Sequence, residues 1–174
     1  MKFLGNYKEW LDSNQALVDF VTNNRGWGRP GEDTNTWSTE KAAEIKRSTD
    51  VGYSYDQNYW YLFTPINTGM EIDPPDIIPR PFKWWVIKMI PGNFMPMHKD
   101  SHVLKHQNDN SKNVNRYWMP LKDWEPGHIF MYEDMVLTNY KAGDLWVYDD
   151  STALHGAANI GHTDRIIMQI SSFD

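Results

Sequence analysis

The spacing of apolar residues predicts helices near the start of the chain. Over residues 7–22, the apolar positions fit one face of a helix. These positions are Trp10, Leu11, Leu17, Val18 and Val21. Residues 38–47 predict a second helix with Ser38 as its N-cap. Residues 24–36 are rich in Gly, Asn, Asp and Thr, and predict a loop between the two helices.

From residue 59 onward, the pattern changes to short aromatic and apolar runs separated by turn residues, which is typical of strands. The predicted strands are residues 59–64, 83–90, 116–121, 128–132, 135–138, 145–148 and 165–171. Glu133 and Asp134 fit a two-residue hairpin turn between two of these strands. The proline-rich residues 74–81 cannot donate a regular ladder of hydrogen bonds, so we interpret them as an extended edge or connector.

Helices followed by about seven short strands indicate a mainly β fold, either a β-sandwich or a jelly roll with N-terminal helices as buttresses. The length of 174 residues is close to the roughly 150 residues expected of one domain. We therefore predict a single domain over residues 1–174, with a helical part at about 1–50 and a jelly-roll core at about 59–172. The end of such a barrel is concave and is a common place for a small-molecule site.

Composition excludes several kinds of chemistry. The chain has no cysteine, which rules out disulfides, thiolate nucleophiles and cysteine-ligated zinc or iron–sulfur centres. Its net charge of −6 disfavours binding to phosphate backbones, so we expect no nucleic-acid partner. No apolar run reaches the roughly 20 residues of a membrane span, and the first residues lack the apolar region of a signal peptide. We therefore expect no membrane partner and a cytoplasmic protein.

His98-Lys99-Asp100 and the distant His155 supply the kinds of side chain that hold non-haem Fe(II). Two imidazoles and one carboxylate fill one face of an octahedron and leave three positions for a bidentate oxo acid and O2. His98 and Asp100 point to the same side if residues 96–100 are extended. His155 comes opposite them only through a long-range pairing of the two segments. The alternative is that these are surface histidines and a solvated aspartate.

A zinc site is a second interpretation of the same region. His98, His102 and His106 recur every four positions and would lie on one face of a helix, a spacing that can bind zinc. Pro96 and the turn at Pro91-Gly92 argue against a helix at His98. We therefore assign His102 and His106 to solvent or to the mouth of the barrel.

Arg165 begins an otherwise apolar predicted strand, where a guanidinium is costly to bury without an anion. A carboxylate held by its bidentate fork would satisfy it, whereas the alternative is a salt bridge to Asp144 or Asp149. Arg116 poses the same question and shares a strand face with Trp118. One arginine is a candidate to bind a cosubstrate and the other a substrate, unless Arg116 is simply exposed.

Several motifs stand in order along residues 83–171. They are Ile90-Pro91-Gly92, His98-Lys99-Asp100, Arg116-Tyr117-Trp118-Met119-Pro120-Leu121 and Gly143-Asp144-Leu145-Trp146-Val147-Tyr148-Asp149-Asp150-Ser151, followed by His155 and Arg165. This part of the chain resembles the Fe(II)/2-oxoglutarate-dependent dioxygenases of the aspartyl/asparaginyl β-hydroxylase type. The resemblance implies a cupin-like double-stranded β-helix. It further implies His98, Asp100 and His155 as the catalytic iron ligands, Arg165 as the partner of the C5 carboxylate of 2-oxoglutarate, and Arg116 and Trp118 near that cosubstrate.

The activity that the resemblance implies is hydroxylation of an unactivated C–H bond. Fe(II) is the cofactor, 2-oxoglutarate and O2 are consumed, and succinate and CO2 are the co-products. The family acts on protein side chains in some members and on small molecules in others, so the substrate does not carry over. Asp100 stands where animal aspartyl β-hydroxylases have glycine, and it argues against the halogenase branch. Some members of the superfamily have Ser or Thr two residues after the arginine; here that residue is Ile167, so another donor must complete the clamp.

Two other classes of function remain open at this point. One is a cupin-like metalloenzyme that binds a divalent metal but not 2-oxoglutarate, and therefore has no need of a carboxylate clamp. The other is a non-catalytic jelly-roll module that binds sugar or peptide through exposed tryptophans and needs no metal.

Overall fold

The structure, a computed structural model, describes residues 1–23, 43, 46–47, 50, 58–61, 71–99, 114–149 and 153–173, with the backbone alone at residues 58–61, 149 and 173. Within these residues the elements are β1 (Lys2–Asn6), α1 (Lys8–Ser13), α2 (Gln15–Asn23), β2 (Asn58–Tyr61), β3 (Phe82–Met89), β4 (Phe94–His98), β5 (Val114–Pro120), β6 (His128–Tyr132), β7 (Met135–Leu137), β8 (Asp144–Asp149), β9 (His155–Asn159) and β10 (Arg165–Phe173). None of the helices described in this part of the chain is long and apolar enough to cross a membrane.

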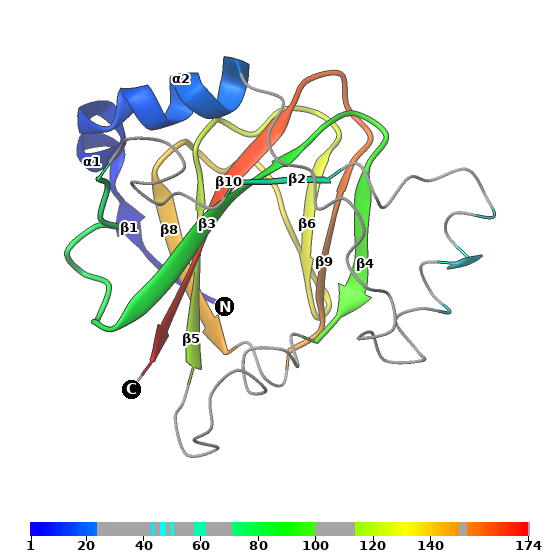
Figure 1. The fold of residues 1–174 in the computed structure, drawn as a ribbon. Coiled ribbons are helices and arrows are strands. Elements are labelled where there is room, and N and C mark those ends of the chain that lie inside the picture. Colours follow the sequence, from blue (N-terminus) through cyan, green and yellow to red (C-terminus); the bar gives the residue numbers. More distant parts are fainter. Residues whose placement is uncertain are drawn as a thin grey trace.

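The strands form two antiparallel sheets that face one another (Figure 1). The larger sheet has the strand order β1-β8-β5-β10-β3-β2, and the smaller has the order β4-β9-β6-β7. From β3 onward the pairs are nested, because β3 pairs with β10, β4 with β9, β5 with β8 and β6 with β7. Successive pairs alternate between the two sheets. This is the topology of a jelly roll, or double-stranded β-helix, and it confirms the predicted fold class.

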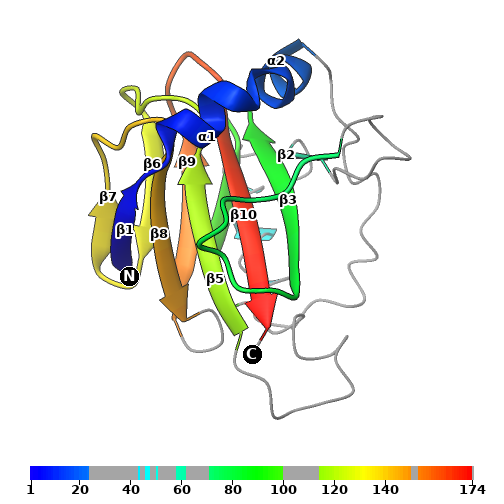
Figure 2. The ribbon, with the colours of Figure 1, turned by 90° about the vertical axis from the view of Figure 1, so that its left-hand side faces the viewer.

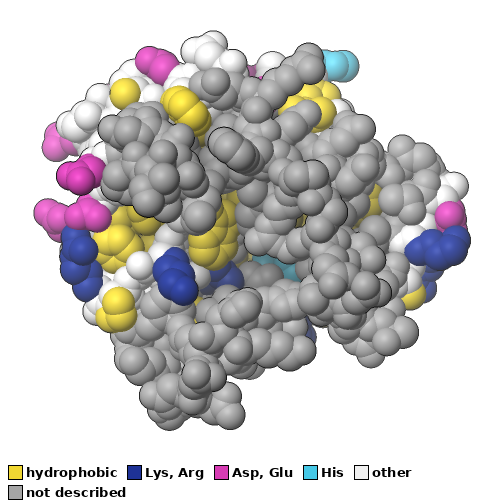
Figure 3. All heavy atoms as spheres, viewed as in Figure 1, with side chains coloured by type: hydrophobic (Ala, Val, Ile, Leu, Met, Phe, Trp, Pro, Cys, Tyr) yellow, Lys and Arg dark blue, Asp and Glu magenta, His cyan; other side chains and the backbone are white. Residues whose placement is uncertain are grey.

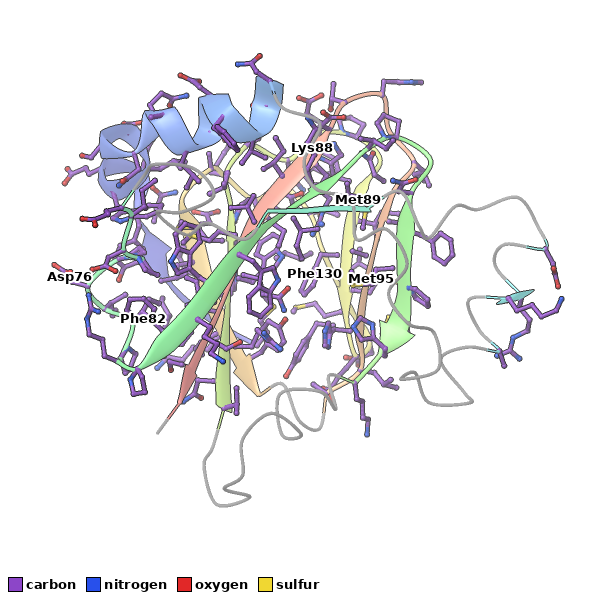
Figure 4. The ribbon with its side chains drawn as sticks, viewed as in Figure 1. Asp76, Phe82, Lys88, Met89, Met95 and Phe130 are labelled. Carbon is purple, nitrogen blue, oxygen red and sulfur yellow. The ribbon has the colours of Figure 1, made fainter. Side chains whose placement is uncertain are left out.

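The larger sheet buries both of its faces. Along β10, Ile166, Met168 and Ile170 join an outer core with α1 and α2, which lie across this sheet (Figure 2). The alternate residues of β10 point to the other face, where Ile167 joins an inner core between the sheets. The buried members of this inner core are Ile87, Met89, Trp118, Phe130, Tyr140, Tyr148, Ala157 and Ile167. In Figure 4, Met89, Met95 and Phe130 lie in this space between the sheets.

All seven segments predicted as strands contain a strand, and Glu133 and Asp134 form the predicted hairpin turn between β6 and β7. Glu133 adopts a positive φ of 53°, as turns of this length require. Three strands were not predicted, namely β1, β4 and β9. The sequences of β4 and β9 explain this, because one contains a proline and the other is His-Gly-Ala-Ala-Asn, without β-branched residues.

The prediction of one helix over residues 7–22 is wrong in detail, because the helix is interrupted at Asn14. The Asn14 amide donates to the Trp10 carbonyl (2.8 Å) and Ser13 Oγ to the Glu9 carbonyl (2.9 Å). Such side-chain bonds to the backbone compete with a regular helix. The start of the N-terminal part is also not helical, since β1 pairs with β8. The predicted loop 24–36 lies outside the described residues, as does most of the predicted helix 38–47.

Candidate active site

The two distant histidines of the predicted metal site are neighbours in the structure. β4 and β9 pair in the smaller sheet, His98 lies opposite His155 in the register, and their ring centroids are 4.5 Å apart. The long-range pairing that the metal-site prediction requires is therefore present. Asp100, the third predicted ligand, lies outside the described residues, as do His102 and His106. His98 ends a strand, so the helical arrangement behind the zinc interpretation is wrong at this residue.

A β-bulge aims His98 into the space between the sheets. Met95 pairs with Ala157 and His98 with His155, so β4 has one residue more than β9 between these two pairs. In a regular strand, residues three apart point to opposite faces, and His98 would turn away from the side on which Met95 meets the inner core. The sequence signal for this bulge is Pro96, which lacks the N–H of a regular ladder.

Glycine at position 156 allows β4 and β9 to approach closely beside the histidines. A Cβ atom there would lie 2.9 Å from Met97 Sδ and 3.0 Å from the Met95 carbonyl oxygen. The Met97 side chain would have to turn away, and the β4 backbone would have to give by a few tenths of an ångström. Gly156 therefore contributes to the spacing of His98 and His155. The sequence alone did not reveal this role, although Gly156 is next to His155.

Both imidazoles are oriented by backbone carbonyls. His98 Nδ1 lies 2.6 Å from the Pro96 carbonyl oxygen, and His155 Nδ1 lies 3.3 Å from the Ala153 carbonyl oxygen. A carbonyl can only accept, so each Nδ1 carries the proton and each Nε2 carries the lone pair. Imidazoles that bind metals are commonly held in this way, with one nitrogen donating to a carbonyl and the other available as a ligand. The donor set therefore fits a divalent metal ion, with two of the three predicted ligands in the described residues.

Arg165 lies at the start of β10 and is buried, with 2% of its surface exposed. Its Nε and Nη2 make no hydrogen bond to any described residue. The guanidinium carbon lies 5.6 Å from the ring centroid of Trp118 and 5.9 Å from that of Phe130. Burial lowers the pKa of Arg165, and the nearby phenols of Tyr140 and Tyr148 oppose this effect. A cation in such surroundings is suited to an incoming anion.

The alternative of a salt bridge between Arg165 and an aspartate is not supported. The Asp144 carboxylate instead accepts from the Lys141 backbone N–H and the Asn6 side-chain amide, both at 2.8 Å. The side chain of Asp149 lies outside the described residues. Among those described, no ion pair to Arg165 occurs.

Two further donors near Arg165 are buried and make no hydrogen bond to the rest of the described structure. They are the Trp118 indole N–H and the Tyr140 hydroxyl. The two rings meet edge to face, with centroids 5.1 Å apart. The sequence predicted Trp118 as a site residue, because it shares a strand face with Arg116, but it did not predict Tyr140. Tyr140 follows β7 in a connecting segment, and neither periodicity nor ligand spacing marks it in the sequence.

Arg116 also points into the space between the sheets and is 1% exposed, so the alternative that it is a surface residue is wrong. Its Nη1 donates to Ser171 Oγ, and its guanidinium lies over the Trp85 ring, 5.0 Å from the centroid. Arg116 and Ser171 are opposite each other on β5 and β10. The structure thus places both predicted arginines and Trp118 on the inner face of the larger sheet.

The turn that precedes Arg165 is fixed by buried polar groups. The Asn159 amide donates to the carbonyl oxygens of Met89 (2.8 Å) and Thr163 (2.7 Å). His128 Nε2 donates to the same Thr163 carbonyl at 3.0 Å, and burial lowers the pKa of this histidine. These bonds give His128 a structural role beside this turn.

In Figure 3, histidine atoms are visible at the bottom of a hollow near the centre of the face shown. Within the described residues, no group of three side chains that could hold a metal occurs. The described part of the site therefore consists of two oriented histidines and, in the same inner space, a buried arginine with unused donors.

Comparisons with known proteins agree with this arrangement. Residues 81–173 match the sequence profile of a protein family described as aspartyl/asparaginyl β-hydroxylase. A comparison with curated protein sequences found no match.

The solved structures that resemble this chain include cupins at low identity. The Cnp3 cupin domain of Schizosaccharomyces pombe is 11% identical, with 71% of this chain and 66% of that one covered and a TM-score of 0.42. A double-stranded β-helix protein from Klebsiella pneumoniae is 16% identical, with 63% and 87% covered and a TM-score of 0.39. A predicted oxalate decarboxylase from Thermotoga maritima is 15% identical, with 70% and 89% covered and a TM-score of 0.42.

The family match covers more than half of the chain, and it includes every strand from β3 to β10. The jelly-roll topology, found independently of the match, is the one that the family resemblance implied. Hydroxylase-type function is the activity that this family indicates. The chain belongs to the aspartyl/asparaginyl β-hydroxylase family.

Proposed function

We propose that this protein is an Fe(II)- and 2-oxoglutarate-dependent dioxygenase that hydroxylates an unactivated C–H bond of a protein side chain or a small molecule. The observation that carries the proposal is the combination, in one inner space, of two oriented histidines with a buried Arg165 whose Nε and Nη2 make no hydrogen bond among the described residues. A metal site alone does not explain a buried cation without an anion among the described residues. A cosubstrate that chelates the metal and ends in a carboxylate explains both.

Three residues would hold the iron, namely His98 and His155 through Nε2 and Asp100 through its carboxylate. Arg165 would bind the C5 carboxylate of 2-oxoglutarate, with Arg116 and Trp118 near the cosubstrate. When bound, Fe(II) and 2-oxoglutarate would supply the chemistry by which O2 oxidises the substrate, with succinate and CO2 as the co-products.

The part played by this chain's own residues is orientation and exclusion of water. The carbonyls of Pro96 and Ala153 favour the tautomer with the proton on Nδ1, in which Nε2 would be the nitrogen that binds a metal. The guanidinium of Arg165, buried beside aromatic rings, meets a carboxylate in a setting where a charge-assisted bond is strong. The ring of Tyr148 lies between these two parts, with its centroid 5.5 Å from that of His155 and its hydroxyl electrostatically coupled to Arg165.

The test is an anaerobic titration of the Fe(II)-loaded protein with 2-oxoglutarate, followed through the visible charge-transfer band of the chelate. We expect a saturable band for the native protein and none for His98→Ala or Asp100→Ala. His162→Ala is the matched control, because His162 is exposed and should leave the band unchanged.

Other outcomes of this titration point to the other two classes of function. Iron binding without a band would favour a cupin-like metalloenzyme that does not use 2-oxoglutarate. No iron binding at all would favour a non-catalytic jelly-roll module. Either result would overturn the proposal.

A further inference from the structure

We infer that Tyr140 is the second half of the carboxylate clamp, donating its hydroxyl to the distal carboxylate that Arg165 binds. This inference rests on the proposed function and adds a residue that determines which oxo acid the site accepts. It answers the question raised by Ile167, which lies two residues after Arg165, joins the inner core and has no donor to offer.

The first argument is hydrogen-bond satisfaction. Buried polar atoms nearly always have partners, so an isolated exception requires a reason. Here Arg165 Nε, Arg165 Nη2 and Trp118 Nε1 are buried and lack a hydrogen-bond partner within the described residues. The Tyr140 hydroxyl makes no well-formed hydrogen bond there, although its oxygen lies close enough to Arg165 to accept weakly from the guanidinium. The guanidinium and indole groups can only donate, and a phenol readily donates. The phenol oxygen alone cannot accept from all of these donors, whereas a carboxylate offers about four acceptor positions on two oxygens.

The second argument is that Tyr140 and Arg165 act on each other electrostatically. Burial raises the pKa of the Tyr140 phenol, and the charge of Arg165, together with a weak hydrogen-bonding interaction from its guanidinium, opposes that rise. Burial lowers the pKa of Arg165, and Tyr140 is the first of the groups that oppose this. Tyr140 therefore lies close to the guanidinium and stays protonated at neutral pH, so its hydroxyl retains the proton that it would donate to a carboxylate.

The third argument is that Tyr140 is held in place without using its hydroxyl. Its backbone carbonyl accepts from the Trp124 N–H at 2.9 Å, which fixes the segment between β7 and β8. Its ring contacts the Trp118 ring edge to face at an interplanar angle of 82°, and only 3% of the residue is exposed. A side chain fixed in this way presents its hydroxyl at low entropic cost when a ligand arrives.

The experiment measures binding rather than turnover. Protein loaded with Mn(II), which replaces Fe(II) without reacting with O2, is titrated in a calorimeter with 2-oxoglutarate and, separately, with 2-oxopentanoate. The second compound has a methyl group in place of the distal carboxylate. We expect Tyr140→Phe to weaken 2-oxoglutarate binding about tenfold or more, the loss typical of a hydrogen bond to a charged group. Binding of 2-oxopentanoate should not change.

Two controls separate this role from a structural one. Tyr117→Phe removes a buried phenol from the outer face of the same sheet and should leave both affinities unchanged. The metal-free Tyr140→Phe protein should melt close to the native protein, because the hydroxyl makes no well-formed hydrogen bond among the described residues.

The outcomes distinguish the inference from the proposed function. If native Mn(II) protein does not bind 2-oxoglutarate, the proposed function fails and the inference fails with it. If native protein binds it and Arg165→Met abolishes binding while Tyr140→Phe does not weaken it, only the inference is overturned. Equal weakening of both oxo acids by Tyr140→Phe would also overturn it, since the hydroxyl would then not act on the distal carboxylate.

Discussion

Each face of the larger sheet buries a cation, Lys88 on the outer face and Arg165 on the inner face, at neighbouring positions of β3 and β10. The two cations differ in their hydrogen-bond partners. Lys88 on β3 points to the outer face, where its Nζ donates to the carbonyls of Val21 (3.1 Å) and Thr22 (3.0 Å) at the end of α2. It also pairs with Asp164 at 3.2 Å. Figure 4 shows Lys88 near the end of that helix. Arg165, one position from Asp164 in sequence, points to the inner face and leaves Nε and Nη2 without such partners in the described residues.

This difference in partners indicates a structural role for Lys88 and a ligand-binding role for Arg165. Burying a charge is expensive unless it is paired and hydrogen-bonded. Lys88 meets that condition and links α2, β3 and the turn before β10. Arg165 does not meet it within the described residues, so its burial needs another explanation, and a bound anion supplies one. Buried polar groups without partners are therefore a better guide to this site than burial or charge alone.

The largest effect on stability is expected from Lys88→Met. The substitution leaves two carbonyls at the end of α2 and the Asp164 carboxylate without their donor. Because Asp164 is partly exposed, we expect a loss of about 2–3 kcal/mol in the free energy of unfolding, near the lower end for a broken buried pair. Urea denaturation measures this loss. Lys83→Met, an exposed lysine on the same strand, is the control and should change little. A similar small change for both would contradict the structural role of Lys88.

Arg165→Met should change the free energy of unfolding in the opposite direction from Lys88→Met. In the metal-free protein it replaces a buried and incompletely partnered cation with an apolar side chain of similar length, so we expect the free energy of unfolding to rise by about 1–2 kcal/mol. The same variant should lose binding of 2-oxoglutarate. Arg80→Met is the control, because Arg80 is exposed and paired with Asp73. A loss of stability comparable with that of Lys88→Met would show that Arg165 has a structural partner, and would remove the contrast between the two faces.

Gly156→Ala alters the inner space without touching a charged group. The added Cβ would lie 2.9 Å from Met97 Sδ and 3.0 Å from the Met95 carbonyl, so the Met97 side chain must turn away and β4 must shift by a few tenths of an ångström from β9. We expect a loss of about 1 kcal/mol in the free energy of unfolding, as for other overpacked sites. We also expect weaker metal binding, because the two histidines lie on these strands. Calorimetric titration with Mn(II) measures the second effect. Unchanged metal affinity would show that the spacing of the strands does not control the site.

The sequence predicted the parts of this fold that depend on strong local patterns. Aromatic and β-branched runs marked seven strands, and the long apolar strand beginning with Arg165 marked that residue as a candidate carboxylate anchor. Local patterns do not reveal β4 and β9, which carry the two histidines, because their stability comes from pairing with distant strands rather than from propensity. The bulge at Pro96 and the position of Tyr140 likewise depend on contacts with residues far away in the sequence. The features that give the site its geometry were therefore the least predictable.

The smallest expected effect is a pH dependence that originates at His128, beside the turn that leads into Arg165. Burial lowers the pKa of this histidine below its ordinary value of 6.5, and the charge of Arg165 lowers it further. Between the lowered pKa and 6.5, the unfolded chain binds more protons than the folded one, so stability falls as the pH drops through this window and is unaffected above it.

Urea midpoints measured from pH 7.5 downward should show this fall in the native protein and a smaller one in His128→Gln, whose amide can still donate to Thr163. Arg165→Met should also reduce the fall, because it removes the inner cation, whereas Lys88→Met should not. A pH profile that responds equally to both cation variants would mean that His128 does not distinguish the two faces of the sheet.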